Sequence, residues 1–285
     1  MKEEFCRIFG EKTHYLRIGS PKSREKIVIL HGWDPTKQVS EGFIPLAKIL
    51  AKKLRAEIII PDLPGFGASP LPHRKYIQSD YNELCEEPRQ AGEIMKKGWS
   101  VWDYSDWLEE FLEKLDLKNP TLYGHSFGCR IISRFLMRNQ DFAGKIILTS
   151  AAGIRLPLSF RQKISQLLAK IFPLAKKIIP RKIQKFIVKK LFGARDWGNC
   201  PKEMKETFQK VIVEPCIREN LREIKNEVLL IWGKEDTVTP LEAGRIFNKK
   251  LKNSHLKVIP KGRHGIHHTH PEKIAEFVVG FLRKK

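Results

Sequence analysis

The chain has 285 residues, of which 41% are hydrophobic and 30% charged, a composition typical of a globular protein with a sizeable core. No apolar run reaches the roughly 18 residues of a membrane-spanning helix, and the charged N-terminus lacks the apolar segment of a secretory signal peptide. The five cysteines are widely spaced and form no Cys-x-x-Cys pair, which favours a reducing, cytoplasmic setting.

The formal net charge of +21 does not by itself indicate nucleic-acid binding. About half of the excess lies in residues 151–194, which hold eleven Lys or Arg residues and no Asp or Glu. The sequence has no zinc-finger spacing, no RNA-binding sheet signature and no basic patch interleaved with aromatic residues. We therefore expect no specific nucleic-acid partner.

Short runs of Ile, Val and Leu alternate with segments whose apolar residues recur every three or four positions. After one or two antiparallel edge strands within residues 3–20, the predicted strands cover residues 27–30, 57–60, 120–123, 145–148, 228–231 and 256–259. The predicted helices cover residues 43–54, 101–115, 127–137, 241–251 and 271–282. This alternation predicts an α/β fold with a mostly parallel central sheet flanked by helices.

Two stretches interrupt the alternation of strands and helices. Residues 72–98 are polar and poorly periodic, which predicts a long loop inserted in the core. Residues 154–215 have helical spacing punctuated by five prolines, which predicts an inserted helical cap. The core would then comprise residues 1–153 and 216–285.

The most informative segment is Gly124-His125-Ser126-Phe127-Gly128, between a predicted strand and a predicted helix. This context is that of a nucleophile elbow, in which a sharp turn lifts the serine hydroxyl clear of the sheet and the glycines avoid collisions with neighbouring chain. The helix N-terminus also directs unpaired amides toward the place where negative charge develops in acyl transfer. Ser126 is therefore the predicted nucleophile. We interpret Cys129, three residues later, as a small buried apolar group.

A serine nucleophile needs a base with a pKa near 7 and a carboxylate that orients this base. Two acids follow the predicted strand 228–231, at the sheet edge where the sites of open α/β folds lie. Asp236 is the predicted orienting acid, and Glu235 is its rival. His264 follows the last predicted strand in a glycine-rich turn and is the predicted base.

Three further histidines, His267, His268 and His270, follow this base, and we interpret them as exposed loop residues. The four clustered histidines lack the His-Glu-x-x-His spacing and an acidic partner. We therefore expect no metal site here.

A second oxyanion donor is expected just after the first buried strand, in His31-Gly32-Trp33. There the main-chain amide of Trp33 can pair with that of Phe127, the residue after the nucleophile. We expect His31, Gly32 and His125, which adjoin these groups, to contribute to substrate binding.

These motifs together resemble the α/β-hydrolase superfamily, in the branch of esterase-like enzymes with a helical cap. The resemblance follows nearly the whole chain in order and weakens over residues 72–98 and across the cap. The segments that carry it are residues 31–33, 61–69, 124–128, 233–236, 262–264 and 271–272.

The resemblance implies Ser126 as nucleophile, His264 as general base and then acid, and Asp236 as the third member of a triad. It also implies that the amides of Trp33 and Phe127 bind the oxyanion. Dehalogenases and epoxide hydrolases of this superfamily carry aspartate at the elbow, and serine at position 126 disfavours both activities.

The expected activity is cleavage of an ester or lactone with a short to medium acyl chain through an acyl-enzyme, without a cofactor. Acyl transfer to another acceptor and hydrolysis of amide or carbon–carbon bonds remain alternatives on the same residues. A non-catalytic protein at a membrane surface is a further alternative.

The predicted cap has an apolar stripe within residues 160–192 and other faces rich in Lys and Arg. This pattern fits a lid whose stripe packs on the core, a roof over an apolar acyl pocket, or a basic surface that associates weakly with anionic lipid.

Overall fold

The computed structural model describes residues 1–34, 39–71, 98–142, 144–156, 201–214, 217–218 and 220–284. The chain divides into two compact units, of which one comprises Met1–Ile154 with Pro201–Lys285 and the other Arg155–Cys200. All the helices and strands reported below belong to the first unit.

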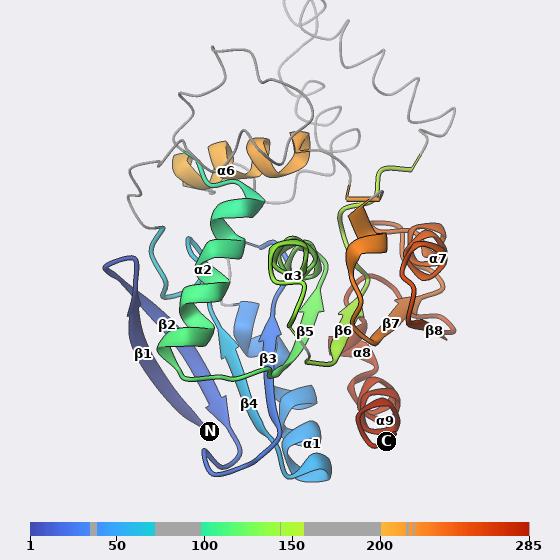
Figure 1. Ribbon diagram of the computed structural model, residues 1–285, viewed down its shortest axis with the longest axis horizontal. Coiled ribbons are helices and arrows are strands. Elements are labelled where there is room, and N and C mark those ends of the chain that lie inside the picture. The colour runs from blue at the N-terminus through green and yellow to red at the C-terminus, as the bar shows by residue number, and fades with distance from the viewer. Residues whose placement is uncertain are drawn as a thin grey trace, which may run out of the picture. The chain divides into compact units, whose positions relative to one another are not determined.

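An eight-stranded sheet forms the centre of the first unit, in the order β1-β2-β4-β3-β5-β6-β7-β8 (Figure 1). Strands β1 and β2 are antiparallel, β2 is antiparallel to β4, and the remaining neighbours are parallel. The mostly parallel central sheet expected from the sequence is thus confirmed. The strands are β1 (Lys2–Ile8), β2 (Glu11–Ile18), β3 (Lys26–Leu30), β4 (Glu57–Pro61), β5 (Thr121–His125), β6 (Ile146–Thr149), β7 (Val228–Gly233) and β8 (Ser254–Ile259).

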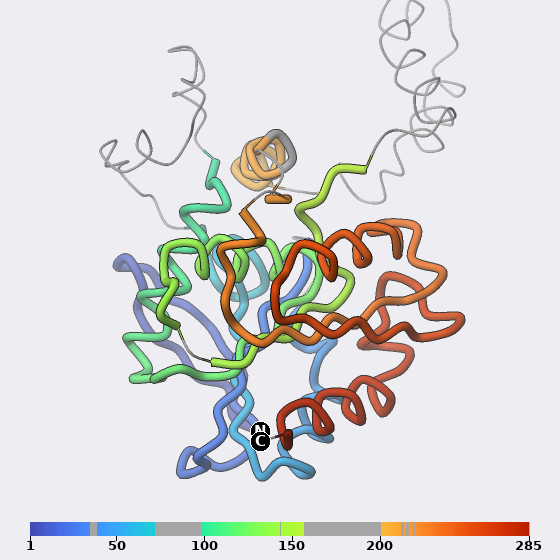
Figure 2. Tube along the Cα trace, turned by 45° about the vertical axis from the view of Figure 1, so that its right-hand side comes forward, coloured from blue at the N-terminus to red at the C-terminus, as the bar shows by residue number. Residues whose placement is uncertain are grey.

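Helices cover both faces of this sheet. Helices α1 (Ile44–Leu54) and α9 (Pro271–Leu282) lie side by side and pack on one face, where Ile29 of β3 joins their apolar cluster (Figures 1 and 2). Helices α2 (Val101–Lys114) and α3 (Phe127–Arg138) also pack on each other, and Gly128 of α3 lies against Leu30. Because successive side chains of a strand point to opposite faces, α3 covers the face opposite α1.

The remaining helices are α6 (Lys202–Val213), α7 (Leu241–Lys250) and the single turn α8 (Ile266–Thr269), with 3-10 helices η1 (Val39–Phe43) and η3 (Asn220–Glu223). Every predicted strand and helix of the core is confirmed to within two residues. Local signals account for several of the bounds. Ser100 and Asp103 form a capping box at the start of α2, with Asp103 Oδ2 accepting from the Ser100 amide at 2.7 Å, and α9 begins at Pro271.

The predicted loop over residues 72–98 lies almost entirely outside the described residues, as does most of the predicted cap over residues 154–215, so both stay predictions. Helix α6 is the described part of that cap segment, and it belongs to the same unit as the sheet. The second segment of the first unit therefore begins at residue 201, whereas the sequence predicted that the core resumes at residue 216. Packing explains this extension, because Phe208 of α6 lies 5.0 Å from the ring of Trp33.

Within the part of the chain that the structure describes, no helix combines the length and the apolar character needed to cross a membrane.

Candidate active site

Ser126 stands at the junction of β5 and α3 with φ 50° and ψ −108°, a conformation that a residue with a side chain rarely adopts. The glycines on either side make this turn sterically possible. A Cβ at Gly124 would lie 2.7 Å from the amide nitrogen of Cys129, and a Cβ at Gly128 would lie 2.3 Å from the carbonyl oxygen of Leu30. The elbow expected from the sequence is therefore present in the backbone, with both glycines in close approaches.

The three polar side chains expected to form the site lie in one hydrogen-bonded chain. Nε2 of His264 is 3.0 Å from Oγ of Ser126, and Nδ1 of His264 is 3.0 Å from Oδ2 of Asp236. They follow β5, β7 and β8, so the parallel sheet brings its carboxyl ends together at one edge. With Asp236 ionised, the ring donates from Nδ1, and Nε2 is then free to accept from the serine hydroxyl.

Asp236 is held in the orientation that this chain requires. Its Oδ1 accepts from the amides of Val238 and Thr239, each at 2.9 Å, and the hydroxyl of Thr239 lies 2.9 Å from Oδ2. Burial alone would raise the pKa of Asp236, but the hydrogen bond to His264, the charge of that ring and the Thr239 amide outweigh burial and hold the pKa at about 2. The Asp236 carboxylate is therefore negatively charged at any pH well above 2.

Glu235, the rival acid, has no part in this geometry. Its side chain is exposed, and its carboxylate lies 3.9 Å from the guanidinium of Arg263 at the surface. Of the two adjacent acids, the structure brings only Asp236 to the imidazole.

Two main-chain amides near Ser126 have no acceptor among the described residues, those of Trp33 and Phe127. Phe127 is the first residue of α3, so its amide has no partner within the helix. The loop that carries Trp33 touches the nucleophile, because a Cβ at Gly32 would lie 3.3 Å from Cβ of Ser126. Both of these amides thus belong to segments that adjoin Ser126.

The imidazoles of His31 and His125 were expected to contribute to substrate binding, but both rings are buried. His31 has no exposed surface, its Nδ1 lies 2.7 Å from the carbonyl oxygen of Gly32, and its Nε2 accepts from the amide of Leu63 at 3.0 Å. The ring of His125 lies 5.0 Å from that of His264, and its Nδ1 is 3.2 Å from Oγ1 of Thr149. The geometry therefore does not support direct substrate contact by either ring.

The three downstream histidines do not share one environment. His268 is exposed, as expected, and His270 is only partly exposed. His267 is buried in α8 and stacks on Phe43 at 4.1 Å with an interplanar angle of 3°. Burial, followed by the rings of His268 and His264, lowers the pKa of His267 to about 2, so this ring is neutral. The interpretation of His267 as an exposed loop residue was wrong, because α8 turns it toward η1. Within the described ranges, no group of three or more His, Cys, Asp or Glu side chains is arranged to hold a metal ion.

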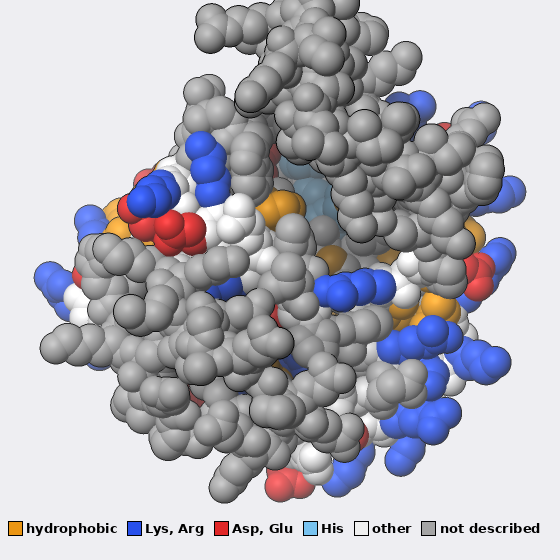
Figure 3. Space-filling model, turned by 90° about the horizontal axis from the view of Figure 1, so that it is seen from above, with side chains coloured by type: hydrophobic (Ala, Val, Ile, Leu, Met, Phe, Trp, Pro, Cys, Tyr) orange, Lys and Arg blue, Asp and Glu red, His pale blue; other side chains and the backbone are white. Residues whose placement is uncertain are grey.

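An aromatic wall adjoins the nucleophile, and the motif reasoning did not identify it as a unit. The ring of Trp33 contacts those of Phe66 at 5.1 Å, Phe127 at 5.2 Å and Phe208 at 5.0 Å. Phe66 lies within residues 61–69, one of the resemblance segments, but no spacing rule connects Phe208 of α6 with this site. Figure 3 shows histidine and hydrophobic surface together on the upper face of the molecule.

Cys129 is a structural thiol. It is buried in α3 with Sγ 3.4 Å from the carbonyl oxygen of Thr149, and burial raises the pKa of this thiol far above its ordinary value. It is therefore protonated and inert as a nucleophile near pH 7.

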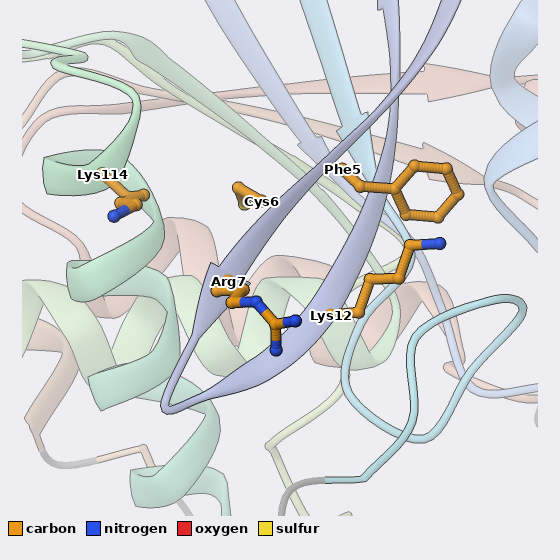
Figure 4. Close-up of a pocket in the computed structure, with 5 residues that line it drawn as sticks. All are labelled: Phe5, Cys6, Arg7, Lys12 and Lys114. Carbon is orange, nitrogen blue, oxygen red and sulfur yellow. The ribbon is translucent and has the colours of Figure 1, made fainter.

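A separate shallow hollow lies on the β1–β2 hairpin and the end of α2, away from the elements that carry this site (Figure 4). Phe5 and Cys6 line it together with three cations, Arg7, Lys12 and Lys114. The ammonium of Lys12 lies 3.6 Å above the ring of Phe5, and Arg7 donates to the carbonyl of Gly10, so two of the cations already have partners.

Comparison with known proteins identifies the family and the fold. The model of the alpha/beta hydrolase family matches residues 27–277. The chain is 23% identical to the uncharacterized hydrolase YugF of Bacillus subtilis over 96% of this chain and 95% of that protein. It is 22% identical to the monoacylglycerol lipase ABHD6 of Rattus norvegicus over 93% of this chain and 77% of the lipase.

The fold is also similar to that of a thermophilic esterase from Thermogutta terrifontis. The two structures share a TM-score of 0.65 at 17% identity, over 99% of this chain and 98% of the esterase.

Proposed function

Because the chain belongs to the alpha/beta hydrolase family, we propose that it is a serine hydrolase that cleaves carboxylic esters or lactones with short to medium acyl chains. One observation carries the proposal, the hydrogen-bonded chain from Ser126 through His264 to the buried Asp236. The two unpartnered amides beside Ser126 supply the remaining requirement of acyl transfer.

The first half-reaction forms an acyl-enzyme. Oγ of Ser126 attacks the carbonyl carbon while Nε2 of His264 takes the hydroxyl proton, and the Asp236 carboxylate stabilises the imidazolium through Nδ1. The oxyanion accepts from the amides of Trp33 and Phe127. As the tetrahedral intermediate collapses, the carbon–oxygen bond to the alcohol breaks, and His264 returns the proton to the leaving oxygen.

The second half-reaction releases the acid. Nε2 of His264 takes a proton from a water molecule, which attacks the acyl carbon of the Ser126 ester. Collapse of the second tetrahedral intermediate breaks the bond to Oγ, and His264 protonates the serine oxygen. The residues of the chain carry every proton, so the reaction requires no cofactor.

The aromatic wall supports an apolar acyl group as the preferred substrate part. The ring of Trp33 contacts those of Phe66, Phe127 and Phe208 beside the nucleophile. Of these rings, those of Trp33 and Phe208 are partly exposed, and burial of an acyl chain against them is favourable by about 25 cal/mol per Å². The ester-cleaving relatives, a monoacylglycerol lipase and an esterase, point to the same class of substrate.

Hydrolysis of p-nitrophenyl esters from acetate to palmitate tests the proposal. We expect activity with a maximum at one chain length, loss of that activity in Ser126→Ala, and labelling by a fluorophosphonate in wild type but not in the variant. Exposed Ser20 offers a matched control, because Ser20→Ala should keep full activity. Ester turnover that survives in Ser126→Ala would contradict the assignment of the nucleophile.

A further inference from the structure

We propose that His31 is a positioning residue of the oxyanion site, whose ring orients the Gly32–Trp33 peptide so that the amide of Trp33 faces Ser126. The inference rests on the proposed function and deepens it. It assigns a role to a side chain that does not touch the reacting atoms.

The partners of His31 determine where its proton lies. The amide of Leu63 can only donate, so Nε2, at 3.0 Å from that nitrogen, must be the acceptor. Nδ1 therefore carries the hydrogen and donates it to the carbonyl oxygen of Gly32 at 2.7 Å. Burial lowers the pKa of His31, which agrees with a neutral ring. A proton on Nε2 would face the Leu63 amide, so the structure accommodates only one tautomer.

The bond to Gly32 sets the direction of the next amide. The carbonyl of Gly32 and the N–H of Trp33 belong to one planar trans peptide, so they point in opposite directions. Because the oxygen of this peptide is drawn toward the buried ring of His31, the N–H is turned away from it. The same loop lies against the elbow, because a Cβ at Gly32 would lie 3.3 Å from Cβ of Ser126 and the ring of Trp33 is 5.2 Å from that of Phe127.

The main chain of His31 ties the same loop to the nucleophile helix. Its carbonyl oxygen accepts from the amide of Gly128 at 3.1 Å, and Gly128 directly follows Phe127, the other proposed oxyanion donor. His31 thus contacts both partners of the oxyanion site, through its backbone to α3 and through its ring to the Gly32–Trp33 peptide. Donors that are aligned before the reaction need no reorganisation in the transition state, and this alignment is the source of their effect on rate.

A merely structural role for this ring would also explain its burial, and two variants separate the two roles. In His31→Asn the amide nitrogen takes the place of Nδ1, so the donor to Gly32 is kept and the acceptor for Leu63 is lost. In His31→Gln the longer side chain places an oxygen near the position of Nε2, so the acceptor for Leu63 is kept and the donor to Gly32 is lost. Each variant removes one buried hydrogen bond, and we expect similar decreases in melting temperature.

Kinetics on the best p-nitrophenyl ester should then differ between the variants. We expect His31→Gln to lower kcat by about 10- to 100-fold with little change in KM, and His31→Asn to retain most of kcat, because removal of one oxyanion donor costs about 10²- to 10³-fold and misalignment costs less. Inhibition by a trifluoromethyl ketone, whose hemiketal oxygen occupies the same site, should weaken in parallel with kcat.

Equal losses of kcat in both variants, or full activity in His31→Gln, would overturn the inference. If neither variant folds, a long-range ¹⁵N–¹H spectrum of wild type labelled at histidine decides instead, and a His31 ring protonated at Nε2 would overturn it. Wild type that neither turns over esters nor reacts with a fluorophosphonate would remove the proposed function itself. An active wild type whose kcat does not depend on the His31 hydrogen bond to Gly32 would instead overturn only the inference about His31.

Discussion

The carboxylate of Asp236 lies 3.0 Å from Nδ1 of His264, whereas the carboxylate of the preceding residue, Glu235, lies at the surface beside Arg263. Two adjacent acids thus have opposite surroundings. The amides of Val238 and Thr239 hold the buried carboxylate in place, and this arrangement determines which acid can act on the imidazole.

Replacement of Asp236 by asparagine should reduce kcat by about 10³- to 10⁴-fold with a small effect on KM, because an amide at this position no longer stabilises the imidazolium and can select the wrong tautomer. Glu235→Gln is the matched control and should retain wild-type kcat. Steady-state kinetics on one ester, with both variants checked for folding by circular dichroism, measure the difference. Comparable losses in the two variants would reject Asp236 as the orienting acid.

The low pKa of Asp236 predicts a dependence of stability on pH. The folded state holds this pKa at about 2, below the ordinary value of 3.8, so the unfolded chain binds the proton more readily. The carboxylate therefore contributes stability above pH 3.8, and this contribution is lost as the pH falls toward 2. We expect the difference in unfolding free energy between wild type and Asp236→Asn to shrink over that window in urea titrations at constant ionic strength. A difference that stays the same below pH 3.8 would contradict this expectation.

Two glycines in helices should respond oppositely to alanine. Gly128→Ala places a Cβ 2.3 Å from the Leu30 carbonyl oxygen, and we expect destabilisation of about 1–3 kcal/mol together with a loss of activity as the elbow shifts. Gly280→Ala in α9 meets nothing within 4 Å and should stabilise the protein by up to about 1 kcal/mol with unchanged kinetics. Chemical denaturation and ester turnover measure both effects. A stable, fully active Gly128→Ala variant would mean that the contact between α3 and β3 is looser than the structure indicates.

The ring of Phe208 should affect substrate preference if the aromatic wall contacts the acyl chain. Phe208→Ala removes an aromatic contact worth about 0.5–1.5 kcal/mol, so we expect kcat/KM for the preferred medium-chain ester to fall about 2- to 10-fold. The value for acetate should change less. Gln209→Ala, an exposed position on the same helix, is the control. An equal fall for all chain lengths would indicate a packing role for Phe208 and no contact with the acyl group.

Local patterns were sufficient for the strands, the helices and the choice of candidate residues for the site. The apolar run at residues 27–30 and the periodic segment at residues 127–137 needed no long-range information, because alternation and helical spacing follow from how each element exposes its side chains. The glycines around Ser126 are likewise a local steric requirement. Asp236 was preferred to Glu235 because the Asp-Thr-x-x-Pro segment that starts the next helix would leave Asp236 facing inward, and in the structure Asp236 is the acid that lies beside His264.

The roles of the buried histidines and of α6 depended on contacts between distant parts of the chain. His267 looked like a loop residue because nothing near it in sequence shows that Phe43 would stack on its ring. His31 was expected to contribute to substrate binding. Its actual partners, the Gly32 carbonyl and the Leu63 amide, are main-chain groups, so no residue type in the sequence indicates them. Helix α6 looked like part of the cap because the ring of Trp33, on which Phe208 packs, lies far away in sequence.

Residue types and their spacing therefore specified the elements, the elbow and the candidate nucleophile, base and acid, since each depends on a few neighbouring positions. Tertiary structure alone decided the two 3.0 Å separations around His264 and the burial of the supporting rings. The physical reason is the order of the strands. Parallel pairing of β5, β6, β7 and β8 brings residues 126, 236 and 264 to one edge of the sheet, and no local pattern contains that order.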